Sequence, residues 1–194
     1  MAKILKKLKR LNPLAKGMLL FVVAAFGLSF LFAPEQKPVD YRELSFKTTS
    51  DSRIYFNNMR SFFYKIDRFS KRPMEIYRLK RRSPERDSIG INFSIAHYPG
   101  AESAYIVCEI GAAYEHCDSL SVKFSKYPDS EQLKLMNGEQ QFKLAAKVYS
   151  SLLEEEAIFL CCASDTLIQL YMDKSSQLDA EVVLEDYFRL TQKN

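Results

Sequence analysis

The stretch INFSIAHYPGAESAYIVCEI, residues 91–110, decides the fold of this chain. Ile91, Phe93 and Ile95 alternate with polar or small residues, which is the period of two of a half-buried strand. A Pro-Gly pair then marks a turn. AYIVCEIGAA (104–113) is almost continuously apolar, as a central strand is. The sequence therefore predicts two strands of a β-sheet joined by a turn.

Further strands are predicted on both sides of this stretch. MEIYRLK (74–80) precedes it and mixes apolar with charged residues before a charged turn. SLSVKFSKY (119–127) follows it and again has a period of two. AIFLCCA (157–163) and TLIQLYM (166–172) flank a Ser-Asp pair, which predicts a hairpin.

An aromatic segment before the strands predicts a helix. RIYFNNMRSFFYKI (53–66) carries an apolar stripe at helical spacing, and Asp51 or Ser52 is a candidate cap. We interpret the stripe as the side of a helix that faces the core, although its aromatic content also suits a strand. Its members are Tyr55, Met59, Phe62, Phe63 and Ile66.

Two later helices complete the predicted domain. Asn137 and Gln140 resemble a capping box before the helix 138–155, whose end we expect near Leu153 or Glu154. Its apolar face consists of Phe142, Ala145, Ala146, Tyr149, Leu152 and Leu153. Asp179 is the predicted cap of a last amphipathic helix, 180–190. These elements predict an α+β fold, with one mainly antiparallel sheet and about three helices packed on it.

The N-terminal region predicts a membrane anchor. Residues 17–33, GMLLFVVAAFGLSFLFA, contain no charge and no polar face. As a helix they span about 26 Å, near the short end of what a bilayer core requires. A cleaved secretory signal is the competing interpretation. The long basic region before the run, and Pro34 directly after Ala33, favour an uncleaved transmembrane helix.

The flanking charges predict the orientation of this anchor. Six Lys or Arg residues and no acid lie in residues 1–16, so this basic segment is expected to stay cytoplasmic. Residues 34–44 are a short linker with two prolines, and residues 45–194 form the extracytoplasmic domain. The predicted location is the inner or plasma membrane, and the lipid bilayer is a partner through residues 17–33.

The charge of the rest of the chain is asymmetric. Residues 34–100 hold 14 basic and 8 acidic side chains, whereas residues 101–194 hold 8 basic and 16 acidic side chains. The two halves either attract each other within one fold or offer a basic face to an anionic partner. The candidate residues for such a face are Arg72, Arg78, Lys80, Arg81, Arg82 and Arg86. Nucleic acid is excluded as a partner outside the membrane.

The four cysteines have two interpretations. Cys108 and Cys117 lie near the end of one strand and in the turn before the next, so a disulfide between them is one candidate. The alternative is that Cys108 and Cys162 are small residues of the core. Cys161 and Cys162 are neighbours in a strand, so their side chains should point to opposite faces.

Motifs for catalysis, metal or cofactors are missing from the sequence. His97 and His116 are the two histidines, and neither has the spacing of a metal site or of a nucleophilic triad. Glycine-rich phosphate loops are also absent. We therefore predict no catalytic residue, no metal and no cofactor. The expected function is a non-enzymatic binding or scaffold module at the cell envelope with a protein partner there. The alternative is a membrane-tethered enzyme whose site forms only in three dimensions.

Overall fold

The computed structural model describes residues 12–31, 37–69, 74–82, 90–98, 100–114, 117, 119–127, 129–134, 136–162 and 166–191, with the backbone alone for 25–31 and 166. The chain divides into two compact units, Met1–Glu35 and Gln36–Asn194. Each unit is described by itself.

The described residues of the first unit contain the helix α2, Pro13–Leu31. Asn12 precedes it and accepts a hydrogen bond from the backbone N–H of Leu14 at 3.2 Å, as an N-cap residue does. Helical structure thus covers residues 17–31 of the run 17–33. No helix among the described residues is both long and apolar enough to cross a membrane.

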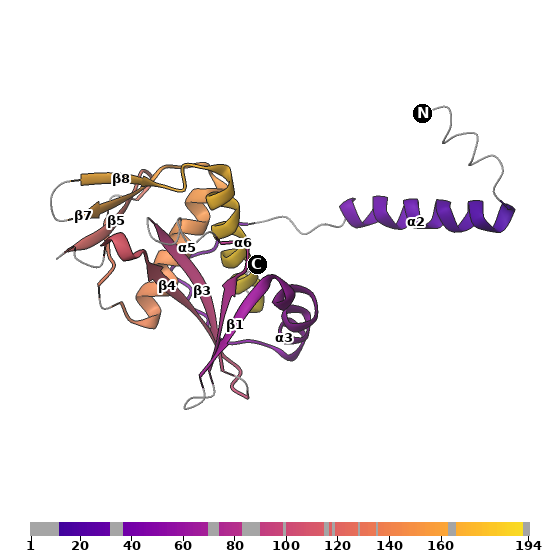
Figure 1. The fold of residues 1–194 in the computed structure, drawn as a ribbon, viewed down its shortest axis with the longest axis horizontal. Helices are drawn as coiled ribbons and strands as arrows, with labels where there is room; N and C mark the ends of the chain where they lie inside the picture. Colours follow the sequence, from indigo (N-terminus) through magenta and orange to yellow (C-terminus); the bar gives the residue numbers. More distant parts are fainter. Residues whose placement is uncertain are drawn as a thin grey trace. The chain divides into compact units, whose positions relative to one another are not determined.

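The first four strands of the second unit form an antiparallel sheet in the order β1-β2-β3-β4 (Figure 1). The strands are β1 (Tyr64–Arg68), β2 (Glu75–Leu79), β3 (Ile91–His97) and β4 (Ala104–Ile110). The register of β3 and β4 places Phe93 opposite Cys108. The strands predicted at 74–80, 91–97 and 104–113 are confirmed.

A second four-stranded antiparallel sheet has the order β6-β5-β7-β8. Its strands are β5 (Leu120–Phe124), β6 (Glu131–Gln132), β7 (Ile158–Cys162) and β8 (Thr166–Leu170). The prediction of a single sheet is therefore wrong, although the strands and the β7–β8 hairpin are confirmed. Alternation identifies a strand, but the edge with which it pairs depends on residues far away in the sequence.

The helices of this unit differ in how well the sequence predicts their bounds. α5 (Gly138–Leu153) begins at the capping box of Asn137 and Gln140, as predicted. α6 (Lys174–Leu190) begins earlier than predicted, because Asp173 accepts hydrogen bonds from the N–H groups of Ser175 and Ser176. Asp179 is consequently inside the helix, where it pairs with Arg81.

The region of the predicted helix 53–66 differs most from the prediction. α3 covers only Ser50–Tyr55, a π-helical turn η1 covers Phe56–Arg60, and a 3₁₀ turn η2 covers Ser61–Phe63. Strand β1 then begins at Tyr64. A further 3₁₀ turn, η3 (Ala112–Tyr114), follows β4.

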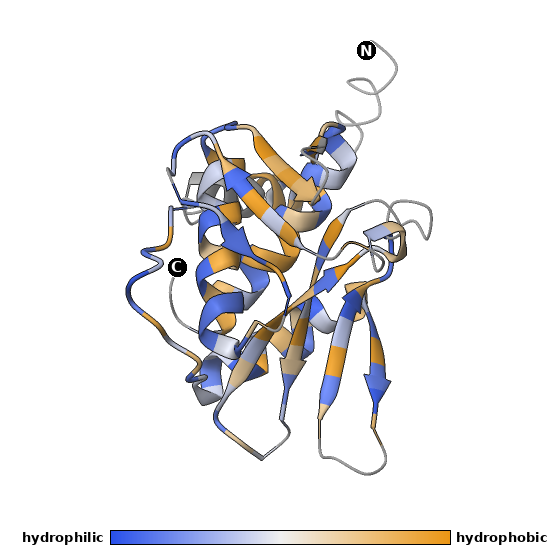
Figure 2. Ribbon diagram, turned by 90° about the vertical axis from the view of Figure 1, so that its left-hand side faces the viewer, coloured by the Kyte–Doolittle hydropathy of each residue, from blue (hydrophilic) through white to orange (hydrophobic). Residues whose placement is uncertain are grey.

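A hydrophobic core joins both sheets to α5 and α6. α5 and α6 are neighbours, and they also contact strands of the first sheet (Figure 1). Phe142 on α5 meets the rings of Tyr187 and Phe188 on α6 at centroid distances of 6.2 and 5.7 Å. Apolar and polar residues alternate along the strands (Figure 2), so each sheet turns one set of side chains to this core.

Candidate binding surface

The segment Ser50–Phe63, which comprises α3, η1 and η2, is fastened to the domain at its start. Thr49 and Ser52 form a capping box, with the Ser52 N–H donating to Thr49 Oγ1 at 3.3 Å. The hydroxyl of Ser52 also donates to the carbonyl of Leu190 at the end of α6, at 2.8 Å. The first turn of the segment is therefore held to the last turn of α6.

The other end of segment 50–63 is fastened through Asp186 on α6. Asp186 is 4% exposed, and its two carboxylate oxygens accept from Arg60 Nε and from the Tyr64 hydroxyl, each at 2.6 Å. Burial and the nearby charge of Asp186 raise the pKa of Tyr64, so this hydroxyl stays a donor. Both oxygens of a buried carboxylate are thus satisfied by groups at the end of the segment.

Phe56 connects segment 50–63 to the core. Its side chain is buried, and its ring lies 5.7 Å from the Tyr64 ring and 5.2 Å from the Tyr77 ring. Such edge and tilted arrangements are favourable for aromatic pairs. Phe56 is the buried apolar residue of the segment, although the predicted stripe does not include it.

The remaining large apolar side chains of the segment face outward. Ile54 is 59% exposed, Met59 59%, Phe62 70% and Phe63 54%. The prediction that the stripe faces the core is therefore wrong for Met59, Phe62 and Phe63. The π and 3₁₀ turns have different rotations per residue from an α-helix, so an α-helical spacing does not keep these residues on one buried face. We call these four side chains the apolar surface.

A hollow of about 450 Å³ lies beside the apolar surface and includes Ile54 in its wall. Its other lining residues are Ser50, Arg53, Asn57, His97 and Gly100. His97 is 9% exposed, and within the described part of the chain its Nε2 has no hydrogen-bond partner. Burial lowers the pKa of His97, so its imidazole is neutral at pH 7.

Arg53 gives this hollow a cationic wall. Its Nη1 donates to Thr48 Oγ1 at 2.9 Å, which fixes the guanidinium, and Glu102 lies 3.9 Å from Nη2. The positive charge of Arg53 also lowers the pKa of His97, whereas Glu75 acts in the opposite direction. The hollow can accept a small apolar group beside one hydrogen-bonding atom.

The predicted basic face is largely neutralised within the fold. Arg78 pairs with Asp67 and, at 2.6 Å, with Glu109, and Arg82 pairs with Glu109 at 3.2 Å. Arg81 pairs with Asp179, and Lys80 donates to the carbonyl of Phe62 at 2.8 Å. Arg72 and Arg86 lie outside the described residues. The pairs to Glu109 and Asp179 join the basic half of the chain to the acidic half.

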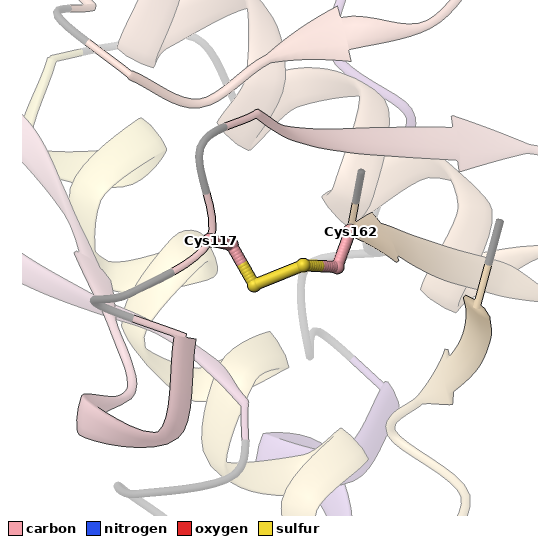
Figure 3. The surroundings of a disulfide bond; sticks show 2 residues. All are labelled: Cys117 and Cys162. Atoms are coloured by element: carbon pink, nitrogen blue, oxygen red, sulfur yellow. A yellow bond between two sulfur atoms is a disulfide. The ribbon is translucent and has the colours of Figure 1, made fainter. Parts of the chain in front are cut away.

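The cysteines pair differently from the candidate disulfide. Cys117 is bonded to Cys162, across a sequence separation of 45 residues (Figure 3). Cys162 is the last residue of β7, and the Cα atoms of the pair are 5.9 Å apart. Cys108 instead opposes Phe93 in the first sheet and stays a thiol, as does Cys161. Burial raises the pKa of Cys108 to about 12, so its thiol is unreactive.

Cys117 pairs with Cys162 and not with Cys108 for a geometric reason. The candidate pair Cys108 and Cys117 was suggested by closeness in sequence, but the turn η3 separates β4 from the start of the second sheet. In that sheet β7 lies beside β5 with Leu120 opposite Cys162, and Cys117 precedes Leu120 by three residues. Distance in space, which sequence separation does not report, therefore selects Cys162. Cys162 packs against the core, as the alternative interpretation expected, but it does so as the disulfide partner of Cys117.

Metal-binding side chains do not gather among the described residues. Within those residues no set of three His, Cys, Asp or Glu side chains is placed to hold a metal ion. His116 lies outside them, and Cys108 does not line the hollow at His97. No family model, curated protein or solved structure matches the chain.

Proposed function

We propose that this chain is a single-pass membrane protein whose extracytoplasmic domain is a non-enzymatic binding module at the cell envelope. The observation that carries the proposal is the apolar surface, Ile54, Met59, Phe62 and Phe63, on a segment fastened at both ends. Large apolar side chains that stay exposed on a segment held by hydrogen bonds at both ends are typical of a surface that another body covers.

The membrane anchor is supported by the N-terminal sequence. The run 17–33 is uncharged and extends beyond the described end of α2 at Leu31. All six cations of the first 33 residues precede it, which favours a cytoplasmic N-terminus. The proposed arrangement is thus residues 1–16 inside, residues 17–33 in the bilayer and the domain outside.

The disulfide supports the outside location of the domain. Disulfides such as Cys117–Cys162 form and persist in oxidising compartments and are rare in the cytosol. The bond lies in the domain and not in the basic N-terminal segment. Its place in the chain therefore agrees with the orientation that the flanking charges predict.

Alkaline extraction and protease protection test the anchor. We expect the full chain to stay with membranes in alkaline carbonate and its domain to be digested only by protease added from the outer side. Release by carbonate, or digestion of the domain from the cytoplasmic side, would overturn the proposed topology. A variant with Leu20→Lys and Val23→Lys should lose membrane association, because charges in the bilayer core are costly.

Site-specific photo-crosslinking tests the binding role. A photoreactive residue at position 59, in the apolar surface, should form adducts in intact membranes. The same residue at position 172 is the matched control. Met172 is also highly exposed, but it follows β8 and lies far from segment 50–63 in the sequence. Equal labelling at both positions would show that the apolar surface has no preferred partner.

A membrane-tethered enzyme is the second candidate function. The observation in its favour is the hollow at His97, whose imidazole Nε2 is buried without a hydrogen-bond partner among the described residues and which Arg53 also lines. Titrating the full chain with small-molecule pools while observing the His97 imidazole by NMR tests this candidate. A compound that shifts the His97 signals and is also converted chemically would favour the enzyme over the binding module.

A further inference from the structure

We propose that strand β1 pairs, edge to edge, with β1 of a second copy of this chain. The pairing is antiparallel and two-fold symmetric, and it joins the first sheets of the two copies into one continuous sheet. The inference deepens the proposed binding role, on which it rests, because it names the body that covers Phe63 of the apolar surface. The reasons are the outer edge of β1, the charges of the strand and the aromatic residues beside it.

The outer edge of β1 carries backbone groups that point away from the sheet. β1 is the first strand in the order of the sheet, and no described strand lies on its outer side. The Phe63 carbonyl accepts from the Lys80 N–H at 2.8 Å, so the odd-numbered residues of β1 bond to β2. The N–H and C=O groups of Ile66 and Arg68 therefore point outward. The Tyr64 carbonyl does so too, whereas its N–H is bonded within the turn η2. Such an edge is a template for another strand.

A two-fold axis at Ile66 lets these outward groups meet one another. Ile66 then faces Ile66 of the second copy, and each donates its N–H to the carbonyl of the other. The Arg68 N–H of each copy donates to the Tyr64 carbonyl of the other copy. A two-fold axis at Lys65 or at Asp67 would also bring outward groups together. The side chains must therefore select the register.

The charges of β1 select the axis at Ile66. In that register Lys65 lies opposite Asp67 of the second copy, and the same pair forms again on the other side of the axis. An axis at Lys65 or Asp67 would place like charges opposite each other, which is destabilising. Within one copy Lys65 Nζ lies 3.7 Å from Asp67 Oδ1, beyond hydrogen-bond distance, while Arg78 binds the other oxygen of Asp67. The Lys65 side chain is 74% exposed, so it can turn to the second copy.

Two exposed phenylalanines flank β1 symmetrically. Phe63 and Phe69 lie at equal distances from Ile66 in the sequence, and they are 54% and 47% exposed. With the axis at Ile66, Phe63 of each copy is opposite Phe69 of the other. Cross-strand aromatic pairs are favourable, and each pair covers apolar area that one copy alone leaves in water. The stretch FYKIDRF (63–69) is thus complementary to itself in charge and in apolar residues.

Disulfide crosslinking of the full chain tests the register. Ile66→Cys is made in a Cys161→Ser background, because Cys161 is a partly exposed thiol. Facing residues of a hydrogen-bonded antiparallel pair have Cα atoms about 5.5 Å apart, which a disulfide can span. Under mild oxidation in detergent we expect Ile66→Cys to give covalent dimers. Arg68→Cys is the matched control and should give none, since the two Arg68 residues would lie about 13 Å apart along the strand.

Exchange of charges in β1 tests what selects this register. Lys65→Glu should weaken dimer formation about tenfold in sedimentation of the full chain in detergent, because acids then oppose each other in both pairs. Adding Asp67→Lys to Lys65→Glu exchanges the two charges and should restore the dimer. Lys123→Glu is the matched control and should leave the dimer unchanged, because Lys123 is an exposed lysine of β5 in the other sheet.

Hydrogen exchange of the unmodified chain gives a test that depends on no variant. The N–H groups of Ile66 and Arg68 should exchange more slowly as the protein concentration rises, because they become bonded in the dimer. A monomer at every concentration, with fast exchange at both residues, overturns the pairing. If adducts with other proteins still form at position 59, the proposed binding role stands.

Two further outcomes would overturn the pairing even if the chain is dimeric. A dimer that Lys65→Glu leaves unchanged is formed by another surface, as contact between two anchors would give. Covalent dimers from Arg68→Cys and none from Ile66→Cys would contradict the axis at Ile66. Failure of Asp67→Lys to restore the dimer of Lys65→Glu would contradict the pairing of opposite charges between the copies.

Discussion

Segment 50–63 and helix α5 have similar sequence patterns but differ in the burial of their apolar side chains. Both begin at a capping box, Thr49 with Ser52 in one and Asn137 with Gln140 in the other. Both also carry aromatic and aliphatic residues at helical spacing. Yet Phe142 of α5 is fully buried, whereas Phe62 is 70% exposed. Periodicity therefore predicted helical structure in both but identified the buried face in only one.

The difference comes from the length and regularity of the two elements. α5 continues for 16 residues as one α-helix, so its apolar stripe stays in phase against β4 and α6. Segment 50–63 changes from α to π to 3₁₀ geometry within 14 residues and ends in a strand. Each change alters the rotation per residue, and Phe56 alone of its large apolar side chains is buried.

Among variants that test this comparison, Phe142→Ala is expected to have the largest effect on the free energy of unfolding. The ring is buried between α5 and α6, so its loss should lower the free energy of unfolding by about 3–5 kcal/mol. Urea denaturation of the full chain in detergent, followed by circular dichroism, measures the change. A loss below about 1 kcal/mol would contradict a tightly packed core at this position.

Loss of the disulfide is expected to have the second largest effect on the free energy of unfolding. The Cys117–Cys162 loop contains α5 and excludes segment 50–63, so replacing both cysteines by serine should cost about 2–4 kcal/mol. Hydrogen exchange that accelerates more in α5 than in segment 50–63 would place the effect within the loop. Thiol titration of the denatured, unreduced wild type should give two thiols, Cys108 and Cys161. Four thiols before reduction would rule the bond out.

Acid should destabilise the domain through His97, which lies at the hollow beside segment 50–63. Its lowered pKa means that the unfolded chain binds a proton at higher pH than the fold does. Stability is therefore lost as pH falls below about 6.5, with a slope of at most about 1.4 kcal/mol per pH unit. His97→Asn should reduce the change of the urea unfolding midpoint between pH 7 and pH 5. His116→Asn serves as the comparison variant. An unchanged slope in His97→Asn would refute the assignment.

The two capping boxes should contribute alike. Thr49→Ala and Asn137→Ala each remove a side-chain acceptor from an N-terminal N–H group, which should cost about 1 kcal/mol. Thermal unfolding of both variants tests whether the short α3 depends on its cap as the long α5 does. A much larger loss for Thr49→Ala would mean that the cap also holds the turns η1 and η2 in place.

The smallest effect is expected for Phe62→Ala. The side chain is mostly exposed in the fold, so the free energy of unfolding in detergent should change by no more than about 0.5 kcal/mol. Urea denaturation under the conditions used for Phe142→Ala gives the direct contrast. A loss comparable to that of Phe142→Ala would show that Phe62 belongs to the core and would remove the basis of the apolar surface.

Local patterns predicted most of the individual elements. Alternation located β2, β3 and β5, a nearly continuous apolar run located β4, and a turn between two apolar runs located β7 and β8. The capping box of Asn137 located the start of α5. These signals work because strand period and helix capping depend on residues close together in the chain. Strand β1 was missed because Tyr64–Arg68 continues the aromatic run of a predicted helix, and β6 because it has only two residues.

The sequence by itself determined the α+β composition, the uncharged run 17–33 with its basic flank, and the charge asymmetry between the halves of the domain. Only the tertiary structure decided that there are two sheets, that Cys117 bonds to Cys162, that Arg78, Arg81 and Arg82 are paired, and that Phe62 is exposed. The physical reason is that each of these features joins residues distant in the chain or depends on what covers a side chain, and neither is encoded in local spacing.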